Sequence, residues 1–103
     1  MIKQAVRMKL YPGQEAEYEK RHKELWPEMR ELLKEHGAQS YSIFLDRETN
    51  YLFGYLEIED EEKWQAVPKT AINQKWWEHM KDIMETNPDN SPISEDLVHV
   101  FEL

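Results

Sequence analysis

Residues 41–58 read YSIFLDRETNYLFGYLEI, and this stretch decides the fold class. Two runs rich in aromatic and branched residues, Tyr41–Asp46 and Tyr51–Ile58, flank the polar segment Arg47–Asn50. Such runs favour extended backbone, and a short polar segment between them is typical of a β-hairpin. Gly54 interrupts the second run, which indicates either a bulge or a group that approaches the backbone closely.

A strand and a helical region are predicted before this hairpin. Ile2–Leu10 alternates apolar residues with polar and basic ones, as a half-buried strand does. From Glu15 to His36 the apolar residues recur at helical spacing instead. Pro27 cannot donate a hydrogen bond to the carbonyl four residues earlier, so we expect the helix to kink or divide at Trp26-Pro27.

Two more helices are predicted after the hairpin. Glu59–Glu62 places four acidic residues at the start of a short helix, where the helix dipole favours negative charge, and Pro68 ends it. Thr70 is a suitable N-cap for the next helix. That helix would bury one apolar stripe, formed by Ile72, Trp76, Met80, Ile83 and Met84.

The end of the chain completes the fold prediction. Asn87–Pro92 has the composition of a loop, and Leu97–Leu103 is predicted to be a final strand. The resulting β-α-β-β-α-β order is the ferredoxin-like plan of the α+β class, an antiparallel sheet with helices on one face, of the dimeric α/β barrel type. A second copy of the chain would cover the other face of the sheet, so we expect a homodimer.

Composition narrows the possible functions. The 103 residues fit a single domain spanning 1–103, with 13 basic and 21 acidic side chains and a net charge of −8. An acidic balance argues against nucleic acid and against anionic membranes as partners. The absence of cysteine excludes disulfides and thiolate metal sites and fits a reducing compartment. No apolar run is long enough to span a membrane, so we expect a cytoplasmic protein.

The histidines are the candidate acid/base residues, because imidazole titrates near neutral pH. His22 lies one helical turn after Tyr18, so both rings should project from the same helix face. The pair could hold a polyol and transfer its proton, or His22 could be a hydrogen-bonded core residue. His36 is interpreted as a cation at a helix end and His79 as a surface residue. The sequence does not indicate which face of the sheet His99 would lie on.

Trp76 and Trp77 are the second candidate feature. They could form an aromatic shelf on which a sugar ring stacks, or one could be a core residue and the other a flank packed on a neighbour. A metal site is not expected, since the Glu19-x-x-His22 spacing needs similar partners on another helix. The three glycines form no phosphate-binding loop.

Four sequence motifs, taken together and in this order, resemble those of one protein family. They are KRHKELWPE at 20–28, HGAQSY at 36–41, WW at 76–77 and NPDNSP at 87–92. In content and order they resemble the L-rhamnose mutarotase family over essentially the whole chain. Lys20 stands where the family motif has an arginine, which keeps a basic residue beside His22.

The resemblance implies a cytoplasmic ferredoxin-like dimer that interconverts the α and β anomers of L-rhamnose. It implies His22 as the proton donor, Tyr18 and Tyr41 as sugar-contacting residues, and Trp76 with Trp77 as the substrate-binding pair. Opening and closing the pyranose ring needs an acid and a base but no redox step, so we expect no cofactor and no metal.

Two other functions are compatible with the same plan. Small dimers of this fold include monooxygenases that are cofactor-independent or degrade haem, which is an analogy at the level of the fold. Haem titration would identify a haem-degrading monooxygenase. The other alternative is a non-catalytic dimer that binds a sugar or a partner, for which sugar would change tryptophan fluorescence without exchange of anomers.

Overall fold

The computed structural model describes all residues from Met1 to Leu103 and contains one four-stranded sheet. The strands are β1 (Ile2–Lys9), β2 (Ala38–Leu45), β3 (Tyr51–Ile58) and β4 (Glu95–Asp96). Their order across the sheet is β2-β3-β1-β4, and all neighbours are antiparallel. This order is that of the ferredoxin-like fold, so the predicted fold class is confirmed.

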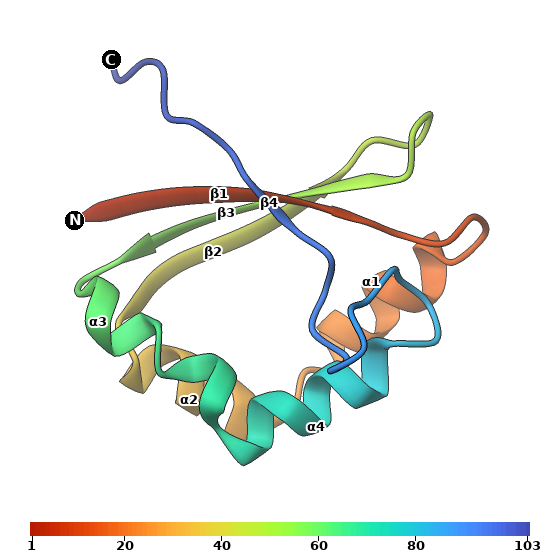
Figure 1. Ribbon diagram of the computed structural model, residues 1–103, viewed down its shortest axis with the longest axis horizontal. Coiled ribbons are helices and arrows are strands. Elements are labelled where there is room, and N and C mark those ends of the chain that lie inside the picture. The colour runs from red at the N-terminus through yellow and green to blue at the C-terminus, as the bar shows by residue number, and fades with distance from the viewer.

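All helices lie on one side of the sheet (Figure 1). They are α1 (Glu15–Lys23), α2 (Pro27–Glu35), α3 (Glu61–Trp64), the 3₁₀ helix η1 (Val67–Lys69) and α4 (Ala71–Met80). Their apolar faces pack on the sheet around a core whose largest fully buried side chains are Leu10, Leu52 and Ile58. None of these helices combines the length and the apolar character that a membrane span requires.

The predicted hairpin is present as β2 and β3. The backbone N–H of Asp46 donates to the carbonyl of Tyr51 at 2.9 Å, and Asn50 turns the chain with a φ of 64°. The bulge lies in β2, between Ala38 and Ser40, and not at Gly54.

Gly54 instead permits a close approach of neighbouring side chains, the second of the two predicted possibilities. A Cβ at this position would lie 3.3 Å from Cγ2 of Val6 and 3.7 Å from Cε1 of Tyr41. The missing side chain therefore lets Val6 of the neighbouring strand pack closely against β3, while Tyr41 lies at ordinary contact distance.

The helical region divides at Trp26-Pro27, as the sequence predicts. Pro27 is the first residue of α2, where its missing N–H costs nothing. Trp26 before it is extended, with a ψ of 134°, since the proline ring disfavours helical backbone at the preceding residue. The axis of α2 can therefore differ from that of α1, and the Trp26 side chain leaves the chain between the two helices.

The caps of the later helices also agree with the sequence. The Asp60 carboxylate accepts hydrogen bonds from the N–H groups of Glu62 and Lys63 at the start of α3. Thr70 caps α4 by accepting from the N–H of Asn73. The predicted apolar stripe extends beyond its helix. The helix α4 ends at Met80, and the buried Ile83 and Met84 follow in the next turn.

The prediction of a final strand over Leu97–Leu103 is wrong. The strand that forms is β4, only Glu95–Asp96, and the last bond to β1 joins Leu97 N–H to the Ala5 carbonyl at 2.9 Å. The following residues leave the sheet as a tail (Figure 1), with Val98 84% and Phe101 73% exposed. Strand propensity was misleading here, since no other element of the chain covers these apolar side chains.

Candidate functional site

A cavity of about 1520 Å³, open to solvent, lies between the helices and the inner face of the sheet. It is larger than a typical small-molecule pocket because it is not closed on all sides. Its walls include all five predicted site residues: Tyr18, His22, Tyr41, Trp76 and Trp77. The fold thus brings together side chains from α1, β2 and α4.

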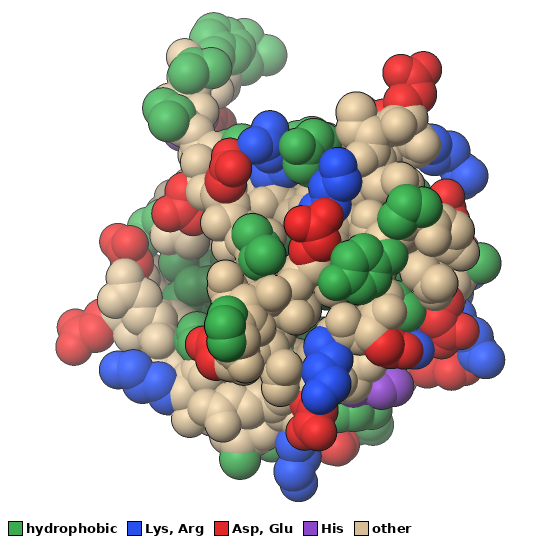
Figure 2. Space-filling model, turned by 45° about the vertical axis from the view of Figure 1, so that its right-hand side comes forward, with side chains coloured by type: hydrophobic (Ala, Val, Ile, Leu, Met, Phe, Trp, Pro, Cys, Tyr) green, Lys and Arg blue, Asp and Glu red, His purple; other side chains and the backbone are tan.

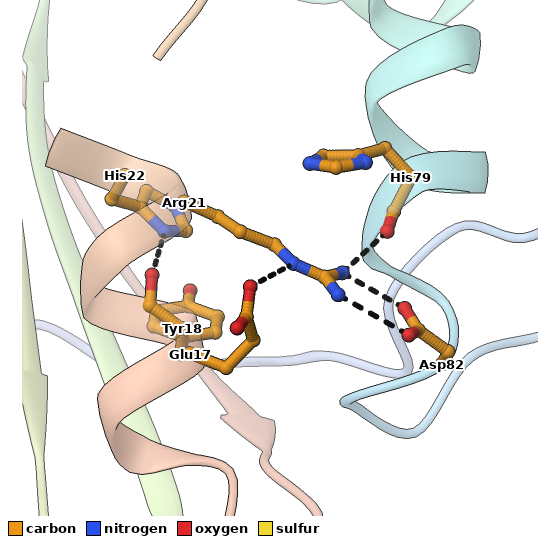
Figure 3. A network of polar contacts seen from close by, with 6 residues as sticks. All are labelled: Glu17, Tyr18, Arg21, His22, His79 and Asp82. Atoms are coloured by element: carbon orange, nitrogen blue, oxygen red, sulfur yellow. Dashed lines mark hydrogen bonds and ion pairs between the residues drawn. The ribbon is translucent and has the colours of Figure 1, made fainter. Parts of the chain in front are cut away.

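Tyr18 and His22 form the α1 side of the site. Their ring centres are 4.3 Å apart, which confirms that both project from one helix face. Nδ1 of His22 lies 3.0 Å from the backbone carbonyl of Tyr18 (Figure 3). A carbonyl can only accept, so Nδ1 carries the proton of the neutral ring and Nε2 keeps its lone pair.

Trp76, on α4, contacts the imidazole of His22 from across the site. Its ring meets that of His22 edge to face, at 5.4 Å between centres and 87° between planes. Trp26 packs against Trp76 in the same manner at 5.2 Å, and the exposed His79 lies beside both tryptophans. His22 is therefore held between a phenol and an indole, and the indole is itself supported by Trp26.

Burial sets the protonation of this group. It lowers the pKa of the His22 imidazole from the usual 6.5, although the hydrogen bond to the Tyr18 carbonyl acts weakly in the other direction. Burial raises the pKa of the Tyr18 phenol, and the neighbouring Tyr41 raises it further. At neutral pH the site therefore holds a neutral imidazole and a protonated phenol.

Tyr41 and Trp77 widen the site away from His22. Tyr41 lies on β2 and contacts Trp64 with ring centres 6.3 Å apart. Its ring stays 41% exposed, while burial around the hydroxyl raises its pKa. Trp77 is half-buried, packs against the core and also lines the cavity. The tryptophan pair thus serves both as core and as cavity wall.

The remaining histidines have structural contacts. Nδ1 of His36 bonds to the Leu32 carbonyl at 2.8 Å near the end of α2. His79 is a surface residue, as predicted, and covers the outer side of the tryptophans. His99 lies in the exposed tail and bonds to the carbonyl of Phe101.

Arg21 connects the two helices that carry the site (Figure 3). Its Nε donates to Glu17 at 2.9 Å, and its Nη1 donates to the backbone carbonyl of His79 at 2.6 Å. Nη1 and Nη2 also reach the two carboxylate oxygens of Asp82, at 2.8 and 3.2 Å. This fork fixes α1 against the C-terminal end of α4.

Sequence reasoning missed one residue of the cavity wall, Asn73, and the residue that joins the two helices, Arg21. Arg21 could have been flagged by its i,i+4 spacing to Glu17, but nothing local predicts its pairing with Asp82. Asn73 lines the cavity from the first turn of α4, and an asparagine among apolar helix positions was the available signal.

Comparison with known proteins gives concordant matches. The family model of L-rhamnose mutarotase matches residues 3–103. An L-rhamnose mutarotase of Enterococcus faecalis is 63% identical over 103 residues, all of both chains. The crystal structure of an L-rhamnose mutarotase from Formosa agariphila has a TM-score of 0.93 at 44% identity and covers 100% of this chain and 99% of that one. A proposed antibiotic biosynthesis monooxygenase from Nitrosomonas europaea has a TM-score of 0.65 at 12% identity, over 98% and 100% of the two chains, and shares the fold alone.

We predict that Arg21→Ala destabilises the protein by about 2 kcal/mol, because it removes charge-assisted hydrogen bonds from a largely buried guanidinium. The near-ultraviolet circular dichroism of the tryptophans should change as α4 shifts. Urea denaturation of Arg21→Ala, Asp82→Asn and the double variant measures the coupling between the two residues.

Lys23→Ala is the matched control for this cycle. It removes an exposed i,i+4 pair with Glu19 on the same helix and should cost less than about 0.5 kcal/mol. Additive effects of the Arg21 and Asp82 variants would contradict a link between α1 and α4.

Proposed function

The chain belongs to the L-rhamnose mutarotase family, and we propose that it interconverts the α and β anomers of L-rhamnose with His22 as the group that moves the proton. The observation that carries the assignment of His22 is its geometry. A neutral imidazole with a free Nε2 lines a cavity whose walls include two phenols and two indoles. The monooxygenase alternative is disfavoured, since that likeness extends only to the fold.

The chemistry of mutarotation suits a single imidazole. The anomeric hydroxyl and the ring oxygen are bonded to the same carbon, so one nitrogen can reach both. Nε2 of His22 takes the proton of the hydroxyl while the bond between the anomeric carbon and the ring oxygen breaks. The imidazolium then gives the proton to the ring oxygen, which leaves an open-chain aldehyde.

Closure of the ring reverses these steps on the other face. The aldehyde group rotates about the bond to the next carbon, His22 removes the proton from the hydroxyl that becomes the ring oxygen, and that oxygen attacks the carbonyl carbon. The proton returns to the new anomeric oxygen, so nothing is oxidised, reduced or transferred to a cofactor. General acid–base catalysis of this kind contributes about 10²–10⁴-fold.

The other residues of the site bind the sugar in this proposal. Trp76 and Trp77 offer flat surfaces on which the C–H groups of the pyranose can pack. The hydroxyls of Tyr18 and Tyr41 stay protonated because burial raises the pKa of each phenol, so each can donate a hydrogen bond to a sugar hydroxyl. These contacts hold the anomeric carbon beside His22.

We predict that His22→Ala loses at least about 100-fold of the catalysed exchange between the anomers, because the imidazole that moves the proton in this mechanism is removed. Saturation transfer between the two anomeric proton signals of L-rhamnose, with and without protein, measures this exchange. His36→Ala is the control and should exchange as fast as the wild type. Equal rates in folded wild type and His22→Ala would contradict the role of His22.

The pH dependence follows from the lowered pKa of His22. Protonated imidazole cannot accept the proton of the anomeric hydroxyl, so kcat/KM should be constant near neutral pH and fall with acid. The half-maximal value should lie below pH 6.5, the ordinary value for histidine. Exchange rates from about pH 5 to pH 8, corrected for buffer, test this. A rate that rises as the pH falls would make the imidazolium the active form.

We further propose that the chain acts as one domain, residues 1–103, in a cytoplasmic homodimer. The outer face of the sheet carries Phe44, 66% exposed, and the tail after β4 is apolar and uncovered. Figure 2 shows the tail projecting from the body of the molecule with apolar side chains at its end. A second copy would supply the surface that these side chains lack.

Light scattering of the purified chain should therefore give twice the mass of one chain. The double variant Val98→Glu with Phe101→Glu should give a single-chain mass, because it places charge on the apolar tail. Thr49→Glu in the exposed hairpin loop is the control and should leave the mass unchanged. A wild type that is monomeric at all concentrations would refute the dimer.

A further inference from the structure

Asn73 is the one residue whose side chain has a buried polar atom without a partner. It lies in the first turn of α4, faces the cavity and is 5% exposed. Its Nδ2 is covered by protein atoms and makes no hydrogen bond, and no other buried side-chain nitrogen or oxygen lacks a partner. Such groups are rare in folded proteins and call for an explanation.

The fold itself gives the Asn73 amide no task. The contact with the Thr70 cap uses the backbone N–H of Asn73, which any residue other than proline would supply. Asparagine is a weak helix former, and an unpaired buried amide destabilises the folded state. An apolar residue of the same size would serve the core better, so the amide is retained at a cost to stability.

We propose that the Asn73 amide binds a hydroxyl of the sugar and thereby sets the affinity and selectivity of the site, a role that rests on the proposed mutarotase function. The amide has two N–H donors and a carbonyl acceptor, which matches a hydroxyl as partner. Because Nδ2 lies under protein atoms, binding includes a turn of the amide about its terminal torsion, which is soft in asparagine.

The position of Asn73 indicates which part of the sugar it contacts. Asn73 precedes Trp76 by three residues, or about 4.5 Å along the helix axis, close to the width of a pyranose ring. The Trp76 ring contacts His22, which stands at the anomeric carbon in the proposed mechanism. Asn73 therefore lies beside the part of the ring remote from the bonds that break.

A contact remote from the reacting atoms is the same in the bound sugar and in the transition state. Its loss should raise KM and leave kcat unchanged, the pattern expected when uniform binding is removed. Loss of His22, by contrast, should lower kcat. The two variants thus separate binding from proton transfer.

The test compares Asn73→Leu with the wild type in three measurements. These are the rate of anomer exchange against L-rhamnose concentration, the binding of methyl α-L-rhamnopyranoside followed by tryptophan fluorescence, and thermal unfolding without sugar. The glycoside cannot open its ring under these conditions, so it reports binding independently of catalysis.

We expect Asn73→Leu to raise KM and the Kd of the glycoside about tenfold, with kcat within about twofold of the wild type. Its melting temperature should equal or exceed that of the wild type, because an unpaired buried amide is replaced by an apolar group. Selectivity for L-rhamnose over L-fucose should decrease. Gln74→Leu, the exposed neighbour on α4, is the control and should leave KM and Kd unchanged.

Unchanged KM and Kd in Asn73→Leu would overturn the inference. A clear drop in melting temperature would also overturn it, because the amide would then be a structural group. If the wild type binds the glycoside but exchanges no anomers, the proposed function fails while the Kd of Asn73→Leu still tests the amide. A wild type that neither exchanges nor binds would refute both.

Discussion

The contact between the imidazole of His22 and the indole of Trp76 is the interaction on which the rest of the site depends. It joins α1 to α4, which are far apart in the sequence, and forms one wall of the cavity above the sheet. Arg21 fixes the same pair of helices from the solvent side through Asp82 and the carbonyl of His79. An aromatic contact inside and an ionic one outside thus join the same two helices.

Local backbone chemistry makes this contact possible. Pro27 cannot continue the first helix, and it forces Trp26 into extended backbone, from which its ring reaches the far side of Trp76. Thr70 starts α4 at the residue that places Trp76 on the buried side. The absence of a side chain at Gly54 lets Val6 of β1 pack closely on β3, next to Tyr41. Short-range rules therefore set the ends of the elements, and these ends determine where the site residues lie.

How well the sequence predicts a feature depends on how far apart in the chain its interacting residues lie. The hairpin, the division at Pro27 and the Thr70 cap were predictable because each depends on residues only a few positions apart. The pairing of Tyr18 with His22 follows from helical spacing, but the approach of Tyr41 from another strand came only from the family resemblance. The Arg21–Asp82 pair and the missing partner of the Asn73 amide arise only in the folded chain. An asparagine among apolar helix positions points to Asn73 but does not show that its amide is unpaired. Strand propensity failed over Leu97–Leu103 because a strand also needs a neighbour to pair with and to cover it, and no other element of the chain provides one beyond Leu97.

The protein is acidic, so the neutral state of His22 has to be explained by the groups immediately around its imidazole. A net charge of −8 would raise the pKa of a histidine if the carboxylates stood close to it. Two carboxylates of this helix are paired with cations, Glu17 with the guanidinium of Arg21 and Glu19 with Lys23. Desolvation is then the largest effect left on His22, and it lowers the pKa. Burial of the imidazole between Tyr18 and Trp76 therefore outweighs the acidic character of the protein, so that Nε2 is free to accept a proton at neutral pH.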